Sequence, residues 1–374
     1  MSEEKLEIGS TYALPKAEFD NLLVRLKEKG FETLGAKVDH DTLVYEPISA
    51  LADLPQGYIS EQKAGEFRLK KVNHDRYFDY IPGAHSWKQF LFPSRQELFT
   101  LRKNGDGWNT ELPDVEQPKY AFIGVRGCEL SAIQIQDGIF MREDFTDPTY
   151  AKRRQNLFVL AVNCLHPAKT CFCTSLKTGP KASPGFDISL TELDDVFLLE
   201  IGSEIGRLVL QGLPLEASSA FLLQTAQKGL ERAEKEIKRE LDTSDLSELM
   251  TKNLTHSHWQ EIAERCLSCG NCTQVCPTCF CWDTVDTSDL LGKETKRERV
   301  WDSCFNPGYS YYAGGNTRPT INTRYRQWLT HKLGTWKEQY GTLGCVGCGR
   351  CIVWCPVGID LTEEIPLFRE EKKS

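Results

Sequence analysis

Apolar residues recur with two different periods in the first hundred residues of the chain. Within residues 19–29 they lie three and four positions apart, which predicts a short amphipathic helix. Residues 42–46 and 66–72 alternate between apolar and polar side chains, which predicts strands bounded by turn-rich segments. We therefore expect a mixed α+β region at the start of the chain.

Continuous apolar runs replace this alternation from residue 120 onward. Residues 120–125, 157–162 and 196–201 are typical of strands that are buried on both faces. Residues 131–141 place apolar side chains at helical spacing between the first two runs. This order of strand, helix and strand predicts a parallel α/β unit, in which functional sites usually lie at the carboxyl ends of the strands.

The rest of the chain is charged and rich in helical patterns. Residues 226–241 pair acidic and basic side chains at helical spacing, which predicts a solvated helix. A second helix is expected from about residue 257, and residues 327–339 carry a stripe of tryptophan and leucine side chains typical of a packed helix.

Composition narrows the class of protein. The length of 374 residues suits two or three domains, and the net charge of −8 argues against nucleic acid or an anionic membrane as the main partner. The longest apolar stretch, residues 157–165, is about half a membrane span, and the start of the chain has no signal-peptide pattern. We expect a cytoplasmic protein without a membrane span, whose fifteen cysteines bind metal instead of forming disulfides.

Eight of these cysteines fall in two copies of one spacing, and each copy ends in proline. The copies are Cys266-x2-Cys269-x2-Cys272-x3-Cys276-Pro277 and Cys345-x2-Cys348-x2-Cys351-x3-Cys355-Pro356. Bacterial ferredoxins with two [4Fe–4S] clusters have this spacing: three thiolates of one run hold one cluster, and the fourth reaches the other. Zinc is the alternative, although zinc sites use separate cysteine pairs.

Crossed ligation assigns every cysteine of the two runs. Cluster 1 takes Cys266, Cys269, Cys272 and Cys355, and cluster 2 takes Cys345, Cys348, Cys351 and Cys276.

A third group of cysteines follows the predicted parallel strands. Cys128 comes just after the first strand and Cys164 just after the second, and Cys171 and Cys173 lie in the next loop. Four thiols at one edge of a sheet suit a third [4Fe–4S] cluster. The alternative is that some of them are buried, unreactive thiols. Cys279, Cys281 and Cys304 remain unassigned, as groups that support ligands, pack in the core or replace one ligand.

These patterns predict an α+β chain in which an N-terminal mixed α/β part precedes an all-helical dicluster ferredoxin domain. The long insert between the two runs, residues 277–344, favours a helical domain over a compact ferredoxin. We expect a mixed α+β region (1–115), an α/β region with the candidate third site (116–215), a helical linker (216–257) and the ferredoxin-like domain (258–374).

Several phrases of the sequence resemble one family. They are Gly124-Val-Arg-Gly-Cys128-Glu-Leu-Ser, Asn163-Cys-Leu-His-Pro, Thr170-Cys-Phe-Cys, Cys276-Pro-Thr-Cys-Phe-Cys, Trp301-Asp-Ser-Cys and Arg324-Tyr-Arg-Gln-Trp-Leu-Thr-His-Lys. The chain resembles the beta subunits of sulfhydrogenases, which are NAD(P)-linked cytoplasmic nickel–iron hydrogenases, and is similar to the related iron–sulfur subunit of anaerobic sulfite reductases. The resemblance covers roughly residues 115–365.

The resemblance implies a non-catalytic subunit that carries electrons between two partners, a flavin subunit linked to NAD(P)H and a hydrogenase catalytic module. The alternatives are the same role in a sulfite reductase, a self-sufficient iron–sulfur enzyme, and a structural or sensing module. The residues agree with a carrier, because no glycine-rich nucleotide fingerprint follows a predicted strand. The last phrase contains four basic residues, for which three roles are open: a basic docking face, hydrogen-bond donors near a cluster, or a solvated helix face. They are Arg324, Arg326, His331 and Lys332.

Overall fold

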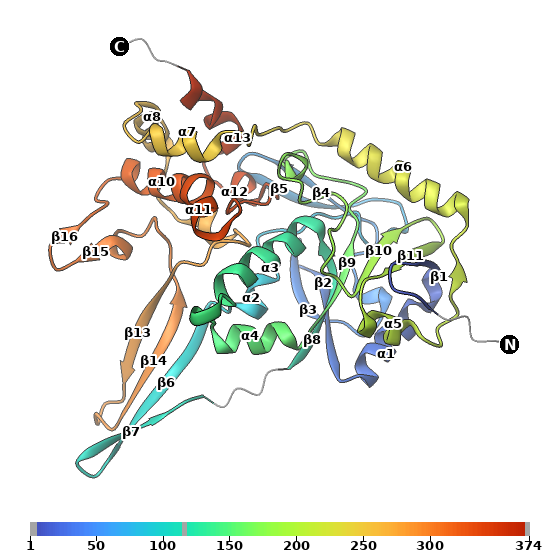
Figure 1. The fold of residues 1–374 in the computed structure, drawn as a ribbon, viewed down its shortest axis with the longest axis horizontal. Coiled ribbons are helices and arrows are strands. Elements are labelled where there is room, and N and C mark those ends of the chain that lie inside the picture. Colours follow the sequence, from blue (N-terminus) through green and yellow to red (C-terminus); the bar gives the residue numbers. More distant parts are fainter. Residues whose placement is uncertain (1–5, 114–117, 371–374) are drawn as a thin grey trace.

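An eight-stranded sheet forms the centre of the molecule (Figure 1). The computed structural model describes residues 6–113 and 118–370. The strands lie in the order β12-β1-β11-β10-β9-β8-β2-β3. Their bounds are β1 Thr11–Pro15, β2 Phe31–Asp39, β3 Thr42–Pro47, β8 Lys119–Arg126, β9 Leu157–Val162, β10 Ile188–Glu192, β11 Val196–Ile201 and β12 Glu216–Ala217.

The predicted parallel unit lies in the middle of this sheet. Strands β2, β8, β9 and β10 are parallel to their neighbours in that group, whereas β11 is antiparallel to β10 and β1. Apolar side chains of β8 and β9 are buried on both faces, as the continuous runs predicted. Helices α1 (Phe19–Glu28) and α5 (Glu204–Leu210) pack on one face, and α3 (Gly127–Phe140) and α4 (Pro148–Gln155) pack on the other.

The sheet takes strands from both of the first two predicted regions. Strands β1–β3 belong to residues 1–115, and β8–β11 belong to residues 116–215. Strand β2 pairs with β8 from Phe31 opposite Lys119 to Gly35 opposite Ile123. The predicted boundary at residue 115 therefore does not separate two sheets.

A four-stranded antiparallel sheet projects from the body as an arm (Figure 1). It is built from β6 (Arg95–Asn104), β7 (Gly107–Glu111), β13 (Trp282–Ser288) and β14 (Glu294–Trp301), in the order β13-β14-β6-β7. Ion pairs connect neighbouring strands, such as Arg297 with Asp286 at 2.6 Å and Arg102 with Glu294 at 2.5 Å. We call these four strands the arm.

The arm corrects the prediction of an all-helical C-terminal domain. Strands β13 and β14 lie between the two cysteine runs, as does the short hairpin of β15 (Tyr311–Tyr312) and β16 (Gly315–Asn316). Residues 282–301 form strands because β14 pairs with β6, nearly two hundred residues earlier in the chain. That long-range partner cannot be inferred from local periodicity.

The remaining C-terminal elements are helices of one to three turns. They are α8 His258–Arg265, α9 Asn271–Gln274, α10 Ile321–Thr330, a π-helical turn at His331–Thr335, α11 Trp336–Tyr340, α12 Arg350–Val353 and α13 Leu361–Glu364. Helices α6 (Ala220–Glu236) and α7 (Leu246–Lys252) connect them to the sheet. The helix predicted at residues 327–339 thus has a π-helical turn in its middle.

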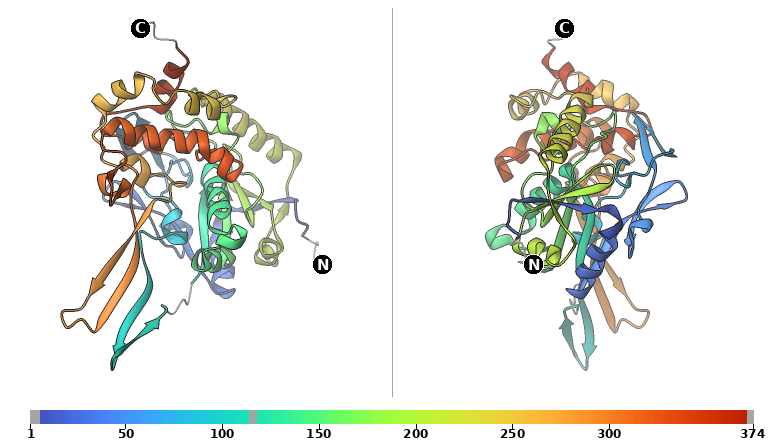
Figure 2. Two further views of the ribbon diagram at one scale, coloured as in Figure 1. Left: turned by 60° about the vertical axis from the view of Figure 1, so that its left-hand side comes forward. Right: turned by 90° about the vertical axis from the view of Figure 1, so that its right-hand side faces the viewer.

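These helices lie beside the main sheet and the β4–β5 hairpin (Figures 1 and 2). The hairpin consists of β4 (Tyr58–Lys63) and β5 (Glu66–Lys71), and its Gly65 N–H donates to the Ile352 carbonyl at 3.1 Å. The N-terminal region therefore contacts the second cysteine run directly. In the part of the chain that the structure describes, no helix has both the length and the apolar character to cross a membrane.

Candidate iron–sulfur centres

Both cysteine runs form the same local backbone. In the first run Ser268 and Gly270 have φ of +53° and +76°, and in the second Gly347 and Gly349 have φ of +64° and +73°. Left-handed conformations close the turn so that N–H groups point back at sulfur. Accordingly, the Ser268 N–H lies 3.4 Å from the Cys266 Sγ.

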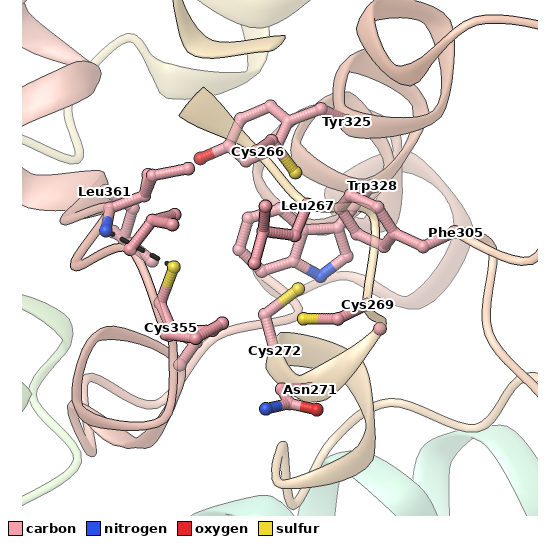
Figure 3. Close-up of a pocket in the computed structure, with 15 residues that line it drawn as sticks. Cys266, Leu267, Cys269, Asn271, Cys272, Phe305, Tyr325, Trp328, Cys355 and Leu361 are labelled. Carbon is pink, nitrogen blue, oxygen red and sulfur yellow. Dashed lines mark hydrogen bonds between the residues drawn. The ribbon is translucent and has the colours of Figure 1, made fainter. Parts of the chain in front are cut away.

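The first group of thiols lies around one small cavity (Figure 3). Cys266, Cys269 and Cys272 face Cys355, which comes from the other run. The Ile359 N–H donates to the Cys355 Sγ at 3.3 Å. Fold geometry therefore brings together the four cysteines that crossed ligation assigns to cluster 1, in a largely apolar setting.

The second group is held together across the same two runs. Burial, with smaller contributions from the neighbouring thiolates of Cys348 and Cys276, raises the pKa of Cys345 to about 12. Cys351 is half-buried beside these three thiols; desolvation raises its pKa, and the three thiols raise it too. The Lys332 ammonium donates to the Cys276 Sγ at 3.3 Å and thereby stabilises the thiolate form.

The third group comes from the edge of the main sheet, where β8 and β9 end. Cys128 lies in the first turn of α3, Cys164 follows β9, and Cys171 and Cys173 come from the next loop. All four line one cavity, together with Cys348 of the second group. Burial raises the pKa of Cys171 to about 12, so that binding of iron there would release protons.

The second group lies between the other two. Cys351 lines the cavity of the first group, and Cys348 lines the cavity of the third. Backbone contacts hold the turn of the second group against the loop of the third: the Phe172 N–H donates to the Gly347 carbonyl at 2.9 Å. The thiol groups are therefore arranged in series.

Unpartnered buried donors show that these cavities suit an anionic group. The indole N–H of Trp328 and two guanidinium nitrogens of Arg126 are buried without a hydrogen-bond partner. Trp328 lines the first cavity, with its nitrogen on the side of Cys269 and Cys272 (Figure 3), and Arg126 lines the third. Buried donors in native proteins normally have a partner, and the sulfurs of a cluster accept hydrogen bonds.

A buried ion pair connects the second and third groups. Arg350 lies between Cys348 and Cys351, and its guanidinium is 2.7 Å from the carboxylate of Glu129 on α3. Both side chains are almost completely buried. This pair was not predicted from the sequence, although the position of Arg350 inside the second run was a usable signal.

Two buried lysines compensate negative charge near Cys276. Lys332, which the sequence left as a donor or a surface residue, is buried in the π-helical turn. Lys88 donates to the carbonyls of Cys276 and Cys279 at 3.0 and 3.2 Å. Nothing in the sequence near Lys88 indicated this role. Arg324 is also buried and donates to backbone carbonyls, so it does not form a free docking face.

Cys279, Cys281 and Cys304 line a separate cavity at the base of the arm. In residues 6–113 and 118–370, no group of three or more His, Cys, Asp or Glu residues is arranged to hold a single metal ion.

The thiol groups define an iron–sulfur protein of the electron-transfer class. A family model described as a 4Fe-4S dicluster domain matches residues 265–359. Sulfhydrogenase 2 subunit beta of Pyrococcus furiosus is 32% identical over 337 residues, which are 88% of this chain and 97% of the relative. The chain belongs to the family of sulfhydrogenase beta subunits, as the resemblance predicted. No solved structure matches it.

We expect Gly349→Ala to disrupt the contact between the second and third groups. A Cβ at Gly349 would lie 2.4 Å from the Thr170 carbonyl oxygen, in addition to the strain of φ +73°. Gly341→Ala is the matched control, because Gly341 has φ +76° with open space around it. Strain alone costs roughly 1–2 kcal/mol, and overpacking adds about 1–3 kcal/mol. Thermal unfolding of the iron-loaded variants measures the difference; equal losses would contradict the contact.

We expect Trp328→Phe to lower the reduction potential of the cluster in the first group. The indole N–H stabilises the more negative reduced cluster, so its removal favours the oxidised state. Trp259→Phe is the control, because the Trp259 indole already donates to the Asn253 carbonyl at 2.7 Å. Redox titration monitored by electron paramagnetic resonance measures both variants. An unchanged potential in Trp328→Phe would show that this N–H does not reach the cluster.

Proposed function

We propose that this chain relays electrons through three [4Fe–4S] clusters from a flavin subunit linked to NAD(P)H to a nickel–iron hydrogenase catalytic module, or in the reverse direction. One observation carries the proposal: the three thiol groups lie in series, and the middle group shares a lining cysteine with each neighbour. Such a series suits transfer between two partners, whereas a cluster that only stabilises a fold needs no neighbour.

The ligands are those expected from the sequence. Cluster 1 is held by Cys266, Cys269, Cys272 and Cys355, cluster 2 by Cys345, Cys348, Cys351 and Cys276, and cluster 3 by Cys128, Cys164, Cys171 and Cys173. Each cluster supplies one-electron exchange when bound. The gathering of each set around one site supports the assignment.

The protein's own side chains control the charge of the sites. Lys332 and Arg350 place buried positive charge beside Cys276 and Cys348, which stabilises reduced, more negative states. The buried aromatic side chains of Tyr325, Trp328 and Phe305 cover part of the first site and lower the local polarity there. No residue is needed as an acid, base or nucleophile for this transfer.

The partners follow from the family. The relative's name describes one subunit of a sulfhydrogenase, which supports assembly of this chain with hydrogenase subunits. The cytoplasmic location of the complex is the expectation drawn from the sequence. A sulfite reductase complex is the alternative that retains the same relay. A self-sufficient enzyme would need an iron without a thiolate, and four cysteines are available to each of the three sites.

The iron content tests the ligand assignment. We expect about twelve iron and twelve sulfide per chain, about four per cluster. Cys164→Ser should remove about four irons and leave clusters 1 and 2 intact. Cys355→Ser should damage cluster 1, although Cys355 belongs to the second run; damage to cluster 2 instead would contradict crossed ligation. About eight irons in the unaltered chain would reject the third site.

The relay itself is tested in the assembled complex. Cys348→Ser removes a ligand of the middle cluster, so it should interrupt the series while leaving both ends functional. We expect the variant complex to reduce its flavin with NAD(P)H at the normal rate and to lose hydrogen-linked activity. Retained hydrogen-linked activity, with assembly of the complex and loss of cluster 2 both verified, would contradict the relay.

A further inference from the structure

Three cysteines outside the proposed clusters share one cavity. Cys279, Cys281 and Cys304 line a cavity of about 130 Å³, together with Tyr309 and Lys332. Cys279 and Cys304 are buried, whereas Cys281 is half-buried. The cavity can hold several water molecules or a small solute, and Cys281, which is half-buried, is the most exposed of the three thiols.

Backbone pairing at the base of the arm brings two of these cysteines together. Cys281 immediately precedes β13, and Cys304 follows the end of β14 by three residues. Trp282 pairs with Trp301, and the Asp302 N–H donates to the Cys281 carbonyl at 2.9 Å. As a result, the thiols of Cys281 and Cys304 line the same cavity and lie close enough for each to shift the pKa of the other.

The two thiols are chemically unequal. The pKa of Cys281 is lowered to about 6, chiefly by the hydrogen bond from Cys304 and to a smaller extent by the Tyr309 hydroxyl and the Lys332 ammonium. The same contact, together with burial, raises the pKa of Cys304. At neutral pH a thiolate therefore lies beside a protonated thiol, which is the arrangement of reactive dithiols.

The pair also lies next to the middle cluster site. Cys279, two residues before Cys281, lies close enough to Cys276, a proposed ligand of cluster 2, to lower the pKa of that thiol. Lys332 lines the cavity and also contacts the Cys276 Sγ at 3.3 Å. Cys279 and Lys332 therefore lie between the Cys281–Cys304 pair and Cys276 of the second thiol group.

We propose that Cys281 and Cys304 form a reversible disulfide that accepts two electrons from the reduced clusters. Reduction would break the sulfur–sulfur bond with two electrons, one from each of two reduced clusters; Cys304 would take up one proton, and Cys281 would be released as the thiolate. Oxidation by two oxidised clusters is the reverse. The source of the electrons rests on the proposed function, whereas formation of the disulfide does not.

Disulfide mapping tests the pair in the full, iron-loaded chain under anaerobic conditions. The chain is equilibrated in glutathione buffers of graded redox ratio, quenched in acid, alkylated and analysed by mass spectrometry. We expect a peptide pair joined through Cys281 and Cys304 in oxidising buffers and free thiols in reducing ones. Cys281→Ser and Cys304→Ser should each abolish the joined pair without loss of iron.

Two results would overturn the disulfide. One is the absence of the joined pair in every buffer while the iron content stays intact. The other is a loss of about four irons in Cys281→Ser or Cys304→Ser, which would make these cysteines cluster ligands. Neither result affects the relay, which the Cys348→Ser complex tests separately.

Coupling to the clusters is tested by counting electrons. The oxidised chain is titrated with a reduced viologen, and cluster reduction is followed by electron paramagnetic resonance. We expect the oxidised, unaltered chain to consume two more electron equivalents per chain than the Cys304→Ser variant does. Equal consumption would overturn the coupling.

The reactivity of Cys281 tests whether the Tyr309 hydroxyl acts on this thiol. If Tyr309 only packed in the structure, removing its hydroxyl would not change that reactivity. We expect Tyr309→Phe to slow iodoacetamide modification of Cys281 in the native chain at pH values near or below 6, because the hydroxyl lowers the pKa of Cys281 and its loss reduces the thiolate fraction there. Tyr312→Phe, an exposed tyrosine of the neighbouring hairpin, should leave the rate unchanged. An equal rate in both variants would overturn the role of the Tyr309 hydroxyl in activating Cys281.

Discussion

The arrangement of this molecule depends on the contact between the second cysteine run and the edge of the main sheet. The Arg350–Glu129 ion pair is the centre of that contact, because both groups are buried and each would be uncompensated alone. Breaking a buried pair by removing one partner typically costs about 3–5 kcal/mol. Gly347 and Gly349 also pack so closely against residues 170–173 that a side chain at either position would clash with that backbone. Together they fix the second thiol group beside the third.

Charge compensation follows from the same contact. Thiols buried away from water are held protonated, as the raised pKa of Cys171 and Cys345 indicates, and they become thiolates when they bind iron. Buried cations such as Lys332 and Lys88 lie near the second site, and Arg126 with its free N–H groups lies at the third. The N-terminal region contributes Lys88 and, through β4 and β5, a cover for the second run. It is therefore part of the cluster environment, even though it carries no cysteine before Cys128.

Local patterns predicted the elements whose neighbours are close in sequence. Strands β8 and β9 and helix α3 were predicted because their apolar runs and helical spacing reflect burial in a parallel unit. The all-helical C-terminal domain was wrong because β14 pairs with β6, and polar alternation in an exposed strand gives little signal without its partner. Lys332 was left ambiguous because a basic residue on a helix looks the same whether it faces solvent or a thiolate.

The sequence by itself determined the family and the iron–sulfur class, because ligand spacing on a tight turn is a local property of the chain. It also placed four further cysteines near the ends of two parallel strands. Only the tertiary structure decided that those four line one cavity, that the second group lies between the other two, and that Cys281 meets Cys304 at the base of the arm. These relations join segments that are tens to hundreds of residues apart, and long-range packing sets their distances.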